Sequence, residues 1–198
     1  LATNPPVPGN GLQVWLKADA GLTLSGTNVS AWADQSINGM NAAQTTPGNM
    51  PQVISNQING KPVIRFNGTT DYLQLPPGLS NMTAGMSFFA VFAPSTAASY
   101  SRLFDFGNGT PSDNLDFYRD STLPTMQYTT WSGSTTSTAF GSSELEQNIT
   151  QEYTGIHNGS SLISLYRNGV FINSGTAVAL NDVTRSYNYL AKSIWTTG

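Results

Sequence analysis

Six acid or amide side chains lie within sixteen residues of the segment LFDFGNGTPSDNLDFYRD. They are Asp105, Asn108, Asp113, Asn114, Asp116 and Asp120. Carboxylate and amide oxygens separated by glycines suit Ca²⁺, which takes hard oxygen ligands in flexible geometry. The spacing does not match an EF-hand loop, and an Asx-rich loop that caps its own turns would have the same composition. The segment therefore predicts either a Ca²⁺ site, with Asp105 and Asp113 as ligands, or a self-capped loop.

Two glutamates and one histidine are the other candidates for catalysis. Glu144 and Glu146 are two positions apart, which on a strand would place both carboxylates on one face, as a glycosidase needs. Their segment, SSELEQN, instead indicates a loop with two solvated carboxylates. His157 is the only histidine and adjoins a predicted turn at the exposed end of a hairpin, without a nearby acid or nucleophile in the sequence. We therefore predict no catalytic site.

Aromatic residues with polar neighbours suggest a sugar-binding surface. An aromatic ring packs against the apolar face of a pyranose, while amides, carboxylates and guanidinium groups bind its hydroxyls. The predicted ligand surface consists of Asn114, Tyr118, Arg119, Tyr128 and Trp131. A second cluster contains Tyr187, Asn188, Tyr189 and Trp195. The alternative is that half of these aromatic residues belong to the hydrophobic core. Trp195 is expected to be one of these core residues.

Composition excludes several classes of partner. Only 10% of the residues are charged, compared with about 25% in typical soluble domains, and the net charge is −3. Such a chain is a poor partner for nucleic acid or anionic membranes. The absence of cysteine excludes disulfides and thiolate chemistry. No apolar run approaches the ~18 residues of a membrane span.

Turn signals and short apolar runs indicate an all-β fold. Asn-Gly, the strongest short hairpin signal, occurs seven times. The predicted strands are Leu12–Lys17, Pro62–Phe66, Tyr72–Leu75, Ser87–Ala93, Arg102–Phe106, Leu115–Tyr118, Met126–Trp131, Glu152–Ile156, Leu162–Arg167 and Val170–Asn173. MSFFAVFA, residues 86–93, is almost wholly apolar, as a central strand buried on both faces would be. ALNDV near Ala179 could form one helical turn.

The domain organisation is simple. Residues 1–11, LATNPPVPGNG, are predicted to be a proline-rich arm or linker, and residues 12–198 a single β-sandwich. In FNGTTDYLQL, Asn67-Gly68 is expected to form a turn whose N–H groups donate to Asp71.

An ordered series of segments carries a family resemblance. GLQVWLKADAGLTL, VSAWADQSINGMNAAQ, INGKPVIRFNGTTDYLQL, MSFFAVFA, LFDFGNG, ISLYRNGVFINSG and YNYLAKSIW follow one another along residues 11 to 195. This series resembles LamG-like jelly-roll domains of the concanavalin A-like lectin/glucanase superfamily. The resemblance implies an antiparallel two-sheet jelly-roll sandwich and often a Ca²⁺ at its rim. The glucanase motif Glu-x-Asp-x-(x)-Glu is not complete here, because Leu145 separates the two glutamates and the third acid is missing.

The resemblance also implies one more strand after YLAKSIW. Its absence leads us to expect either a truncated chain or an open sheet edge that accepts a strand from another chain. The expected function is a non-catalytic carbohydrate-binding or adhesion module, extracellular or on a cell or virion surface, with a glycan or glycoprotein as partner. The alternative is a structural subunit of a virion, tail or surface filament that self-assembles through strand or edge exchange. A glycosidase or polysaccharide lyase comes third.

Overall fold

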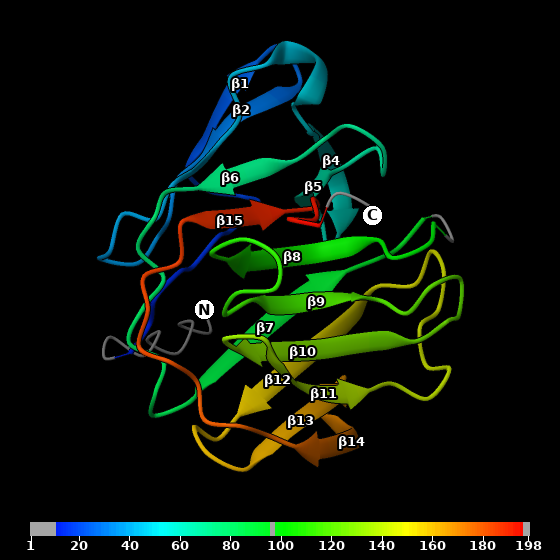
Figure 1. Cartoon of the computed structure of the whole chain (residues 1–198). Helices are drawn as coiled ribbons and strands as arrows, with labels where there is room; N and C mark the ends of the chain where they lie inside the picture. Colours follow the sequence, from blue (N-terminus) through cyan, green and yellow to red (C-terminus); the bar gives the residue numbers. More distant parts are fainter. Residues whose placement is uncertain (1–10, 96–97, 196–198) are drawn as a thin grey trace, which may run out of the picture.

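The protein is an all-β sandwich of two antiparallel sheets (Figure 1), as predicted. A computed structural model describes residues 11–95 and 98–195, so the predicted arm lies outside the described residues apart from Gly11. The large sheet has eleven strands in the order β11-β10-β9-β8-β15-β6-β3-β2-β4-β5, with β1 paired to β2. The small sheet has four, in the order β14-β13-β12-β7.

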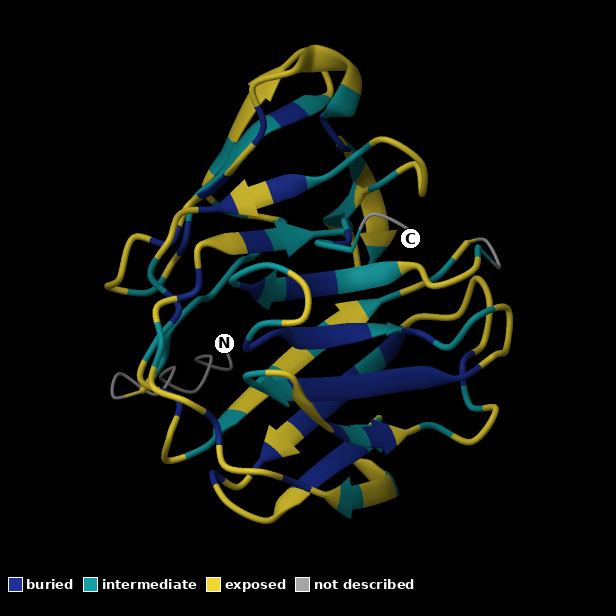
Figure 2. Cartoon of the chain, viewed as in Figure 1, coloured by how far each residue is buried: buried dark blue, intermediate teal, exposed yellow. Residues whose placement is uncertain are grey.

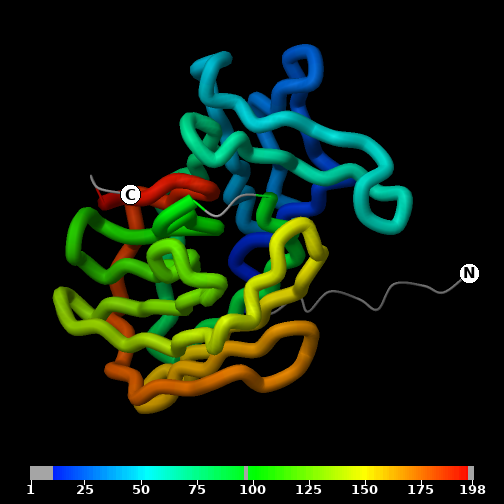
Figure 3. The backbone as a smooth tube through the Cα atoms, turned by 90° about the vertical axis from the view of Figure 1, so that its right-hand side faces the viewer, coloured from blue at the N-terminus to red at the C-terminus, as the bar shows by residue number. Residues whose placement is uncertain are grey.

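The strands of the large sheet are short. They are β1 (Leu22–Ser25), β2 (Asn28–Trp32), β3 (Ala42–Ala43), β4 (Gln52–Ile58), β5 (Lys61–Arg65), β6 (Leu73–Leu75), β8 (Arg102–Gly107), β9 (Leu115–Arg119), β10 (Met126–Ser132), β11 (Thr135–Phe140) and β15 (Tyr187–Leu190). The small sheet consists of β7 (Met86–Phe92), β12 (Gln151–His157), β13 (Leu162–Arg167) and β14 (Val170–Thr176). The β4–β5 and β13–β14 hairpins lie at opposite ends of the molecule (Figure 3).

The Asn-Gly pairs form turns in two ways. At Asn59-Gly60 and Asn168-Gly169 both residues have positive φ, as a type I′ hairpin turn requires. At Asn67 and Asn158 the side-chain oxygen instead accepts N–H groups of the following loop, such as Thr69 N at 2.9 Å. The predicted role of Asp71 is confirmed, because its Oδ2 accepts the N–H of Asn67 at 3.0 Å.

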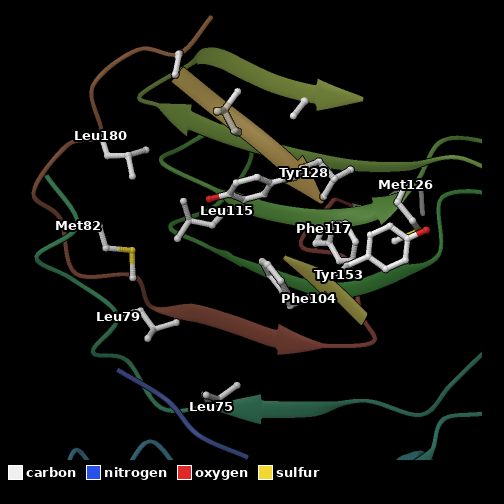
Figure 4. Packing of buried hydrophobic residues seen from close by; sticks show 14 of the residues in the cluster. Leu75, Leu79, Met82, Phe104, Leu115, Phe117, Met126, Tyr128, Tyr153 and Leu180 are labelled. Atoms are coloured by element: carbon white, nitrogen blue, oxygen red, sulfur yellow. The ribbon is translucent and has the colours of Figure 1, made fainter. Parts of the chain in front are cut away.

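Aromatic and aliphatic side chains fill the space between the two sheets (Figure 4). The ring of Phe117 on β9 is fully buried and lies 4.7 Å from that of Phe88 on β7 and 5.4 Å from that of Tyr153 on β12, centroid to centroid. Gly155 on β12 lies directly opposite Phe88, and a Cβ at this position would overlap the Phe88 ring. The glycine therefore makes room for the aromatic contact that joins the sheets.

Two predicted elements differ from the structure. Residues Leu12–Lys17 are not a strand; this segment is held by single hydrogen bonds, such as Trp15 N to Asp34 Oδ1 at 2.8 Å. ALNDV is not helical, and the one helix within the described ranges is the 3₁₀ turn Pro47–Asn49. No helix among these residues is long and apolar enough to cross a membrane.

The strand β7 also differs from its prediction. It is an edge strand of the small sheet, not a central one, and its partner among the described strands is β12. Burial alternates along it (Figure 2), so that Phe89 is 76% and Val91 62% exposed. The unbroken apolar run predicts burial on both faces. Whether a strand is central or at an edge depends, however, on which strands pair with it.

Candidate functional site

The outer face of the large sheet, turned away from the small sheet, brings two carboxyl groups together. Side chains alternate along a strand, so Phe104 and Phe117 point into the core while Asp105 on β8 and Asp116 on β9 point outward. The register of β8 and β9 places the two aspartates directly opposite each other. Both are nevertheless buried, at 0% and 2% exposure.

Burial and the proximity of the two carboxyls favour the protonated form of Asp116. Burial raises the pKa of the Asp116 carboxyl well above its usual range, and the charge and hydrogen bond of Asp105 raise it further. Oδ2 of Asp116 accepts the indole N–H of Trp131 at 3.0 Å, whereas Oδ1 is buried with no other partner. The protonated form of Asp116 has an O–H that can donate to Asp105.

Asp105 accepts hydrogen bonds from two further directions. Its Oδ1 accepts Asn114 Nδ2 at 3.1 Å and its Oδ2 accepts the N–H of Ile194 at 2.8 Å. Arg102 Nε lies 3.8 Å from the same Oδ2. The Ile194 N–H belongs to the segment that follows β15. Its hydrogen bond to Asp105 therefore holds this segment next to the two carboxyls.

That segment also brings two aromatic clusters together. The rings of Trp131 on β10 and Trp195 lie 5.5 Å apart, centroid to centroid, and both side chains are half-buried. Trp195 was expected in the core, and its partial exposure corrects this prediction. The two clusters are separate in the sequence and meet because β15 pairs with β8.

Tyr118 extends the face on β9. Its hydroxyl donates to Gln127 Oε1 at 2.7 Å, and the guanidinium of Arg102 lies 4.3 Å from the centre of its ring. Burial raises the pKa of Tyr118, which therefore stays a neutral hydroxyl at physiological pH. We call the surface formed by Arg102, Tyr118, Trp131 and Trp195, with Asp105 and Asp116 buried beneath it, the outer aromatic face.

A second group of rings adjoins this face, on β15 and directly before β6. Tyr189 lies opposite Asp105 in the strand register, and its ring meets Tyr72 edge-on at 5.8 Å. The ammonium of Lys192 lies 4.1 Å from the Tyr72 ring centre and 4.6 Å from that of Tyr189. The aromatic surface thus continues from β10 to β6.

The five predicted ligand residues separate into two groups. Tyr118 and Trp131 are half-buried on the outer aromatic face. Asn114 is fully buried beneath it, Arg119 is 5% exposed with its Nε donating to the carbonyl of Leu123, and Tyr128 is 0% exposed. Tyr128 lies in the core (Figure 4). Its ring centroid is 5.0 Å from that of Phe88. The prediction of an exposed Tyr128 and Arg119 is therefore wrong, because both point to the inner side of their strands.

Sequence reasoning missed Arg102 and the pairing of Asp105 with Asp116. A signal was present in the two strings FDF and LDF. An acid between two apolar residues on a strand must point away from the core that its neighbours enter. Two such acids on consecutive antiparallel strands indicate a possible cross-strand pair.

The two predicted calcium ligands lie in different settings. Asp105 is on β8, whereas Asp113 lies in the β8–β9 loop, where its Oδ1 accepts the N–H of Gly133 at 2.7 Å and Asn181 Nδ2 at 2.8 Å. In residues 11–95 and 98–195, no three acid or histidine side chains gather closely enough to hold a metal ion. The Ca²⁺ site stays a prediction, and the Asp113 carboxyl joins its loop to the β10–β11 turn and to Asn181.

The remaining candidates for chemistry have structural contacts. Glu144 accepts the N–H of Met126 at 3.1 Å, and Glu146 forms an ion pair with Arg167. His157 is 1% exposed rather than at an exposed turn; its Nδ1 accepts the N–H of Gly159 at 2.9 Å and its Nε2 lies 3.0 Å from the Val178 carbonyl. Burial lowers the pKa of His157, so the ring is neutral and joins two loops.

Comparison with known proteins identifies the fold. The family model of the concanavalin A-like lectin/glucanases superfamily (Laminin_G_3) matches residues 67–198. The binding domain of Paraclostridial Mosquitocidal Protein 1 has a TM-score of 0.52 and 14% identity over 86% of this chain. This chain covers 48% of that domain, about half its length. At this identity the likeness concerns the fold.

Two other solved structures are more distant. Carbohydrate-binding module CBM66 from Bacillus subtilis has a TM-score of 0.43 and 6% identity, and the match covers 71% of this chain and 87% of the module. The binding domain of Botulinum Neurotoxin DC, solved in complex with SialylT, has a TM-score of 0.44 and 12% identity, with 84% of this chain and 48% of that domain covered. No curated protein matches the sequence.

Proposed function

Because the chain belongs to the concanavalin A-like lectin/glucanase superfamily, we propose that it is a non-catalytic carbohydrate-binding module. The outer aromatic face is its ligand surface. The observation that carries the proposal is the pair of half-buried indole rings, Trp131 and Trp195, beside the guanidinium of Arg102 and the hydroxyl of Tyr118. Rings that pack on a pyranose beside groups that bind hydroxyls are what a sugar site needs.

The carboxyl groups support a binding role over hydrolysis. Glycosidases place two carboxyls about 5–10 Å apart on either side of the scissile bond. Asp105 and Asp116 are both buried and lie opposite each other on neighbouring strands, so they do not stand on either side of a bound sugar. Their role on this face is to hold the ring of Trp131 through its indole N–H.

Replacement of Trp131 by alanine should weaken glycan binding about tenfold, because it removes one of the two stacking rings. A glycan array, run with and without EDTA, first identifies the ligand. Titration with this glycan then compares the affinity of the wild type with that of the variant. Phe171→Ala is the matched control, since Phe171 is 54% exposed on β14 of the other sheet and should bind normally.

The array also tests the calcium prediction, because binding through a Ca²⁺ would disappear in EDTA. Correctly folded protein that binds no glycan under either condition would contradict the proposal. Unchanged affinity in Trp131→Ala would exclude the outer aromatic face as the site.

We propose an extracellular location, on a cell or virion surface, from the low share of charged residues and the many hydroxyls and amides. Fractionation of the producing cells or particles tests this location. Recovery only from the cytosol would contradict it.

A second candidate function, self-assembly of a structural subunit, is favoured by the edge strand β7. Edge strands of monomeric proteins usually carry charge, proline or a bulge that blocks pairing. The sequence of β7, MSFFAVF, has no charge or proline, and Phe89 and Val91 are exposed on it. Phe89 is its central residue, so two β7 strands can pair antiparallel about a two-fold axis at Phe89.

The variant Val91→Lys should abolish this association, because each copy would bring a lysine into an apolar strand pair. Sedimentation at high protein concentration should show a dimer for the wild type and a monomer for the variant. Val170→Lys is the control, because Val170 is 68% exposed on β14, the other edge of the same sheet. A strictly monomeric wild type would exclude this candidate.

A further inference from the structure

A hollow of about 340 Å³ lies at the other end of the large sheet, where β2, β4 and β5 form the upper part of the molecule in Figure 1. The residues that line it include Asn28, Met50, Gln52, Arg65, Asn67 and Asp71. Its volume is at the lower end of the range for ligand pockets, which suits a single small ring. None of these residues belongs to the outer aromatic face.

One wall of the hollow is a row of polar side chains across three strands. The strand register places Asn28 on β2 opposite Gln52 on β4, and Gln52 opposite Arg65 on β5. Residues paired in this way share one face of the sheet. The row therefore consists of the Asn28 amide, the Gln52 amide and the Arg65 guanidinium, in this order. Gln52 Nε2 lies 3.5 Å from Asn28 Oδ1.

The loop that carries Asn67 and Asp71 also lines the hollow, and its own hydrogen bonds hold its shape. Oδ1 of Asn67 accepts the N–H groups of Thr69, Thr70 and Asp71 at 2.9 to 3.1 Å. A backbone bond from Tyr72 N to Asn49 O, at 3.1 Å, ties this loop to the 3₁₀ turn. A site held in this way loses little entropy when a ligand binds.

The hollow holds a positive and a negative group that are not paired with each other. Arg65 forms no ion pair within the part of the chain that the structure describes, and its Nη2 donates to the neutral amide of Gln57 at 3.2 Å. Asp71 uses Oδ2 for the N–H of Asn67. A guanidinium with no carboxylate partner can bind a ligand carboxylate with two parallel hydrogen bonds.

We propose that this hollow binds one hexuronic acid unit, a sugar that carries a carboxylate. Arg65 binds the carboxylate, while Asp71, Asn28 and Gln52 bind ring hydroxyls, and Met50 contacts the apolar side of the ring. The site is separate from the outer aromatic face and does not depend on the function proposed for it.

The test is an NMR titration of the ¹⁵N-labelled chain with D-glucuronate, D-glucose and acetate. Glucuronate should shift the N–H signals of Gly48, Asn67 and Asp71 in a saturable way. Glucose, which lacks the carboxylate, and acetate, which lacks the hydroxyls, should each bind at least about tenfold more weakly. Equal binding of glucose or of acetate would overturn the proposal.

Variants locate the site. Arg65→Gln should weaken glucuronate binding about tenfold, and Arg65→Lys less, because lysine keeps the charge but not the two parallel bonds. Arg65 is exposed, so the fold should survive, which thermal denaturation checks. Phe171→Ala, on the other sheet, should leave glucuronate binding unchanged. Loss of binding in Trp131→Ala with normal binding in Arg65→Gln would assign the sugar to the outer aromatic face and overturn this site.

Discussion

Replacement of Asp105 by asparagine is expected to lower the free energy of unfolding by about 3 kcal/mol. The Asp105 side chain accepts hydrogen bonds from Asn114 Nδ2 and from the N–H of Ile194, and it lies opposite the carboxyl of Asp116. An asparagine keeps the shape but removes the charge and turns one acceptor into a donor that faces other donors. Urea denaturation of the two proteins at pH 7 measures the difference.

Asp116→Asn is the matched control, since it changes the other carboxyl of the same pair in the same way. An amide at position 116 can still donate to Asp105 and accept from Trp131, as the protonated acid does. We therefore expect its free energy of unfolding at pH 7 to equal or exceed that of the wild type. Equal losses in the two variants would contradict the unequal roles of the two carboxyls.

The pair also predicts the pH dependence of stability. The pKa of Asp116 is higher in the folded state than its ordinary value of 3.8, so between these two values the folded state binds more protons than the unfolded state. The contribution of Asp116 to stability therefore falls as the pH rises through this window. Asp116→Asn should abolish this fall when unfolding is measured in steps from pH 4 upward.

Phe117→Ala is expected to cost about 3–5 kcal/mol, the largest effect of any single substitution proposed for this protein. The ring is fully buried and contacts Phe88, Phe104 and Tyr153 from three strands of the two sheets. Its removal leaves a cavity between the sheets, and the loss is a large part of the 5–15 kcal/mol that stabilises a typical domain.

Phe89→Ala is the control for this substitution. Phe89 lies on β7 of the small sheet, whereas Phe117 lies on β9 of the large sheet, and the Phe89 side chain is 76% exposed. The same change there should alter stability by less than about 0.5 kcal/mol. Thermal or urea unfolding of both variants separates the effect of burial from that of residue type, and a small loss in Phe117→Ala would contradict the packing between the sheets.

The sequence by itself determined the class of fold. Asn-Gly turns and alternating runs are local signals, because they depend on the φ that two residues adopt and on the two-residue period of a strand. Asn59-Gly60 and Asn168-Gly169 form the expected type I′ turns, and Asp71 holds its own loop. The family resemblance added the sandwich architecture, which the family match at residues 67–198 confirms.

Only the tertiary structure decided which residues meet. Alternation along a strand divides its side chains between two faces, but it does not say which face is covered or which strand lies next to it. That information comes from pairings between distant segments, such as β15 with β8. These pairings put Tyr128 in the core, bring Trp195 to Trp131, place β7 at an edge and set Asp105 opposite Asp116.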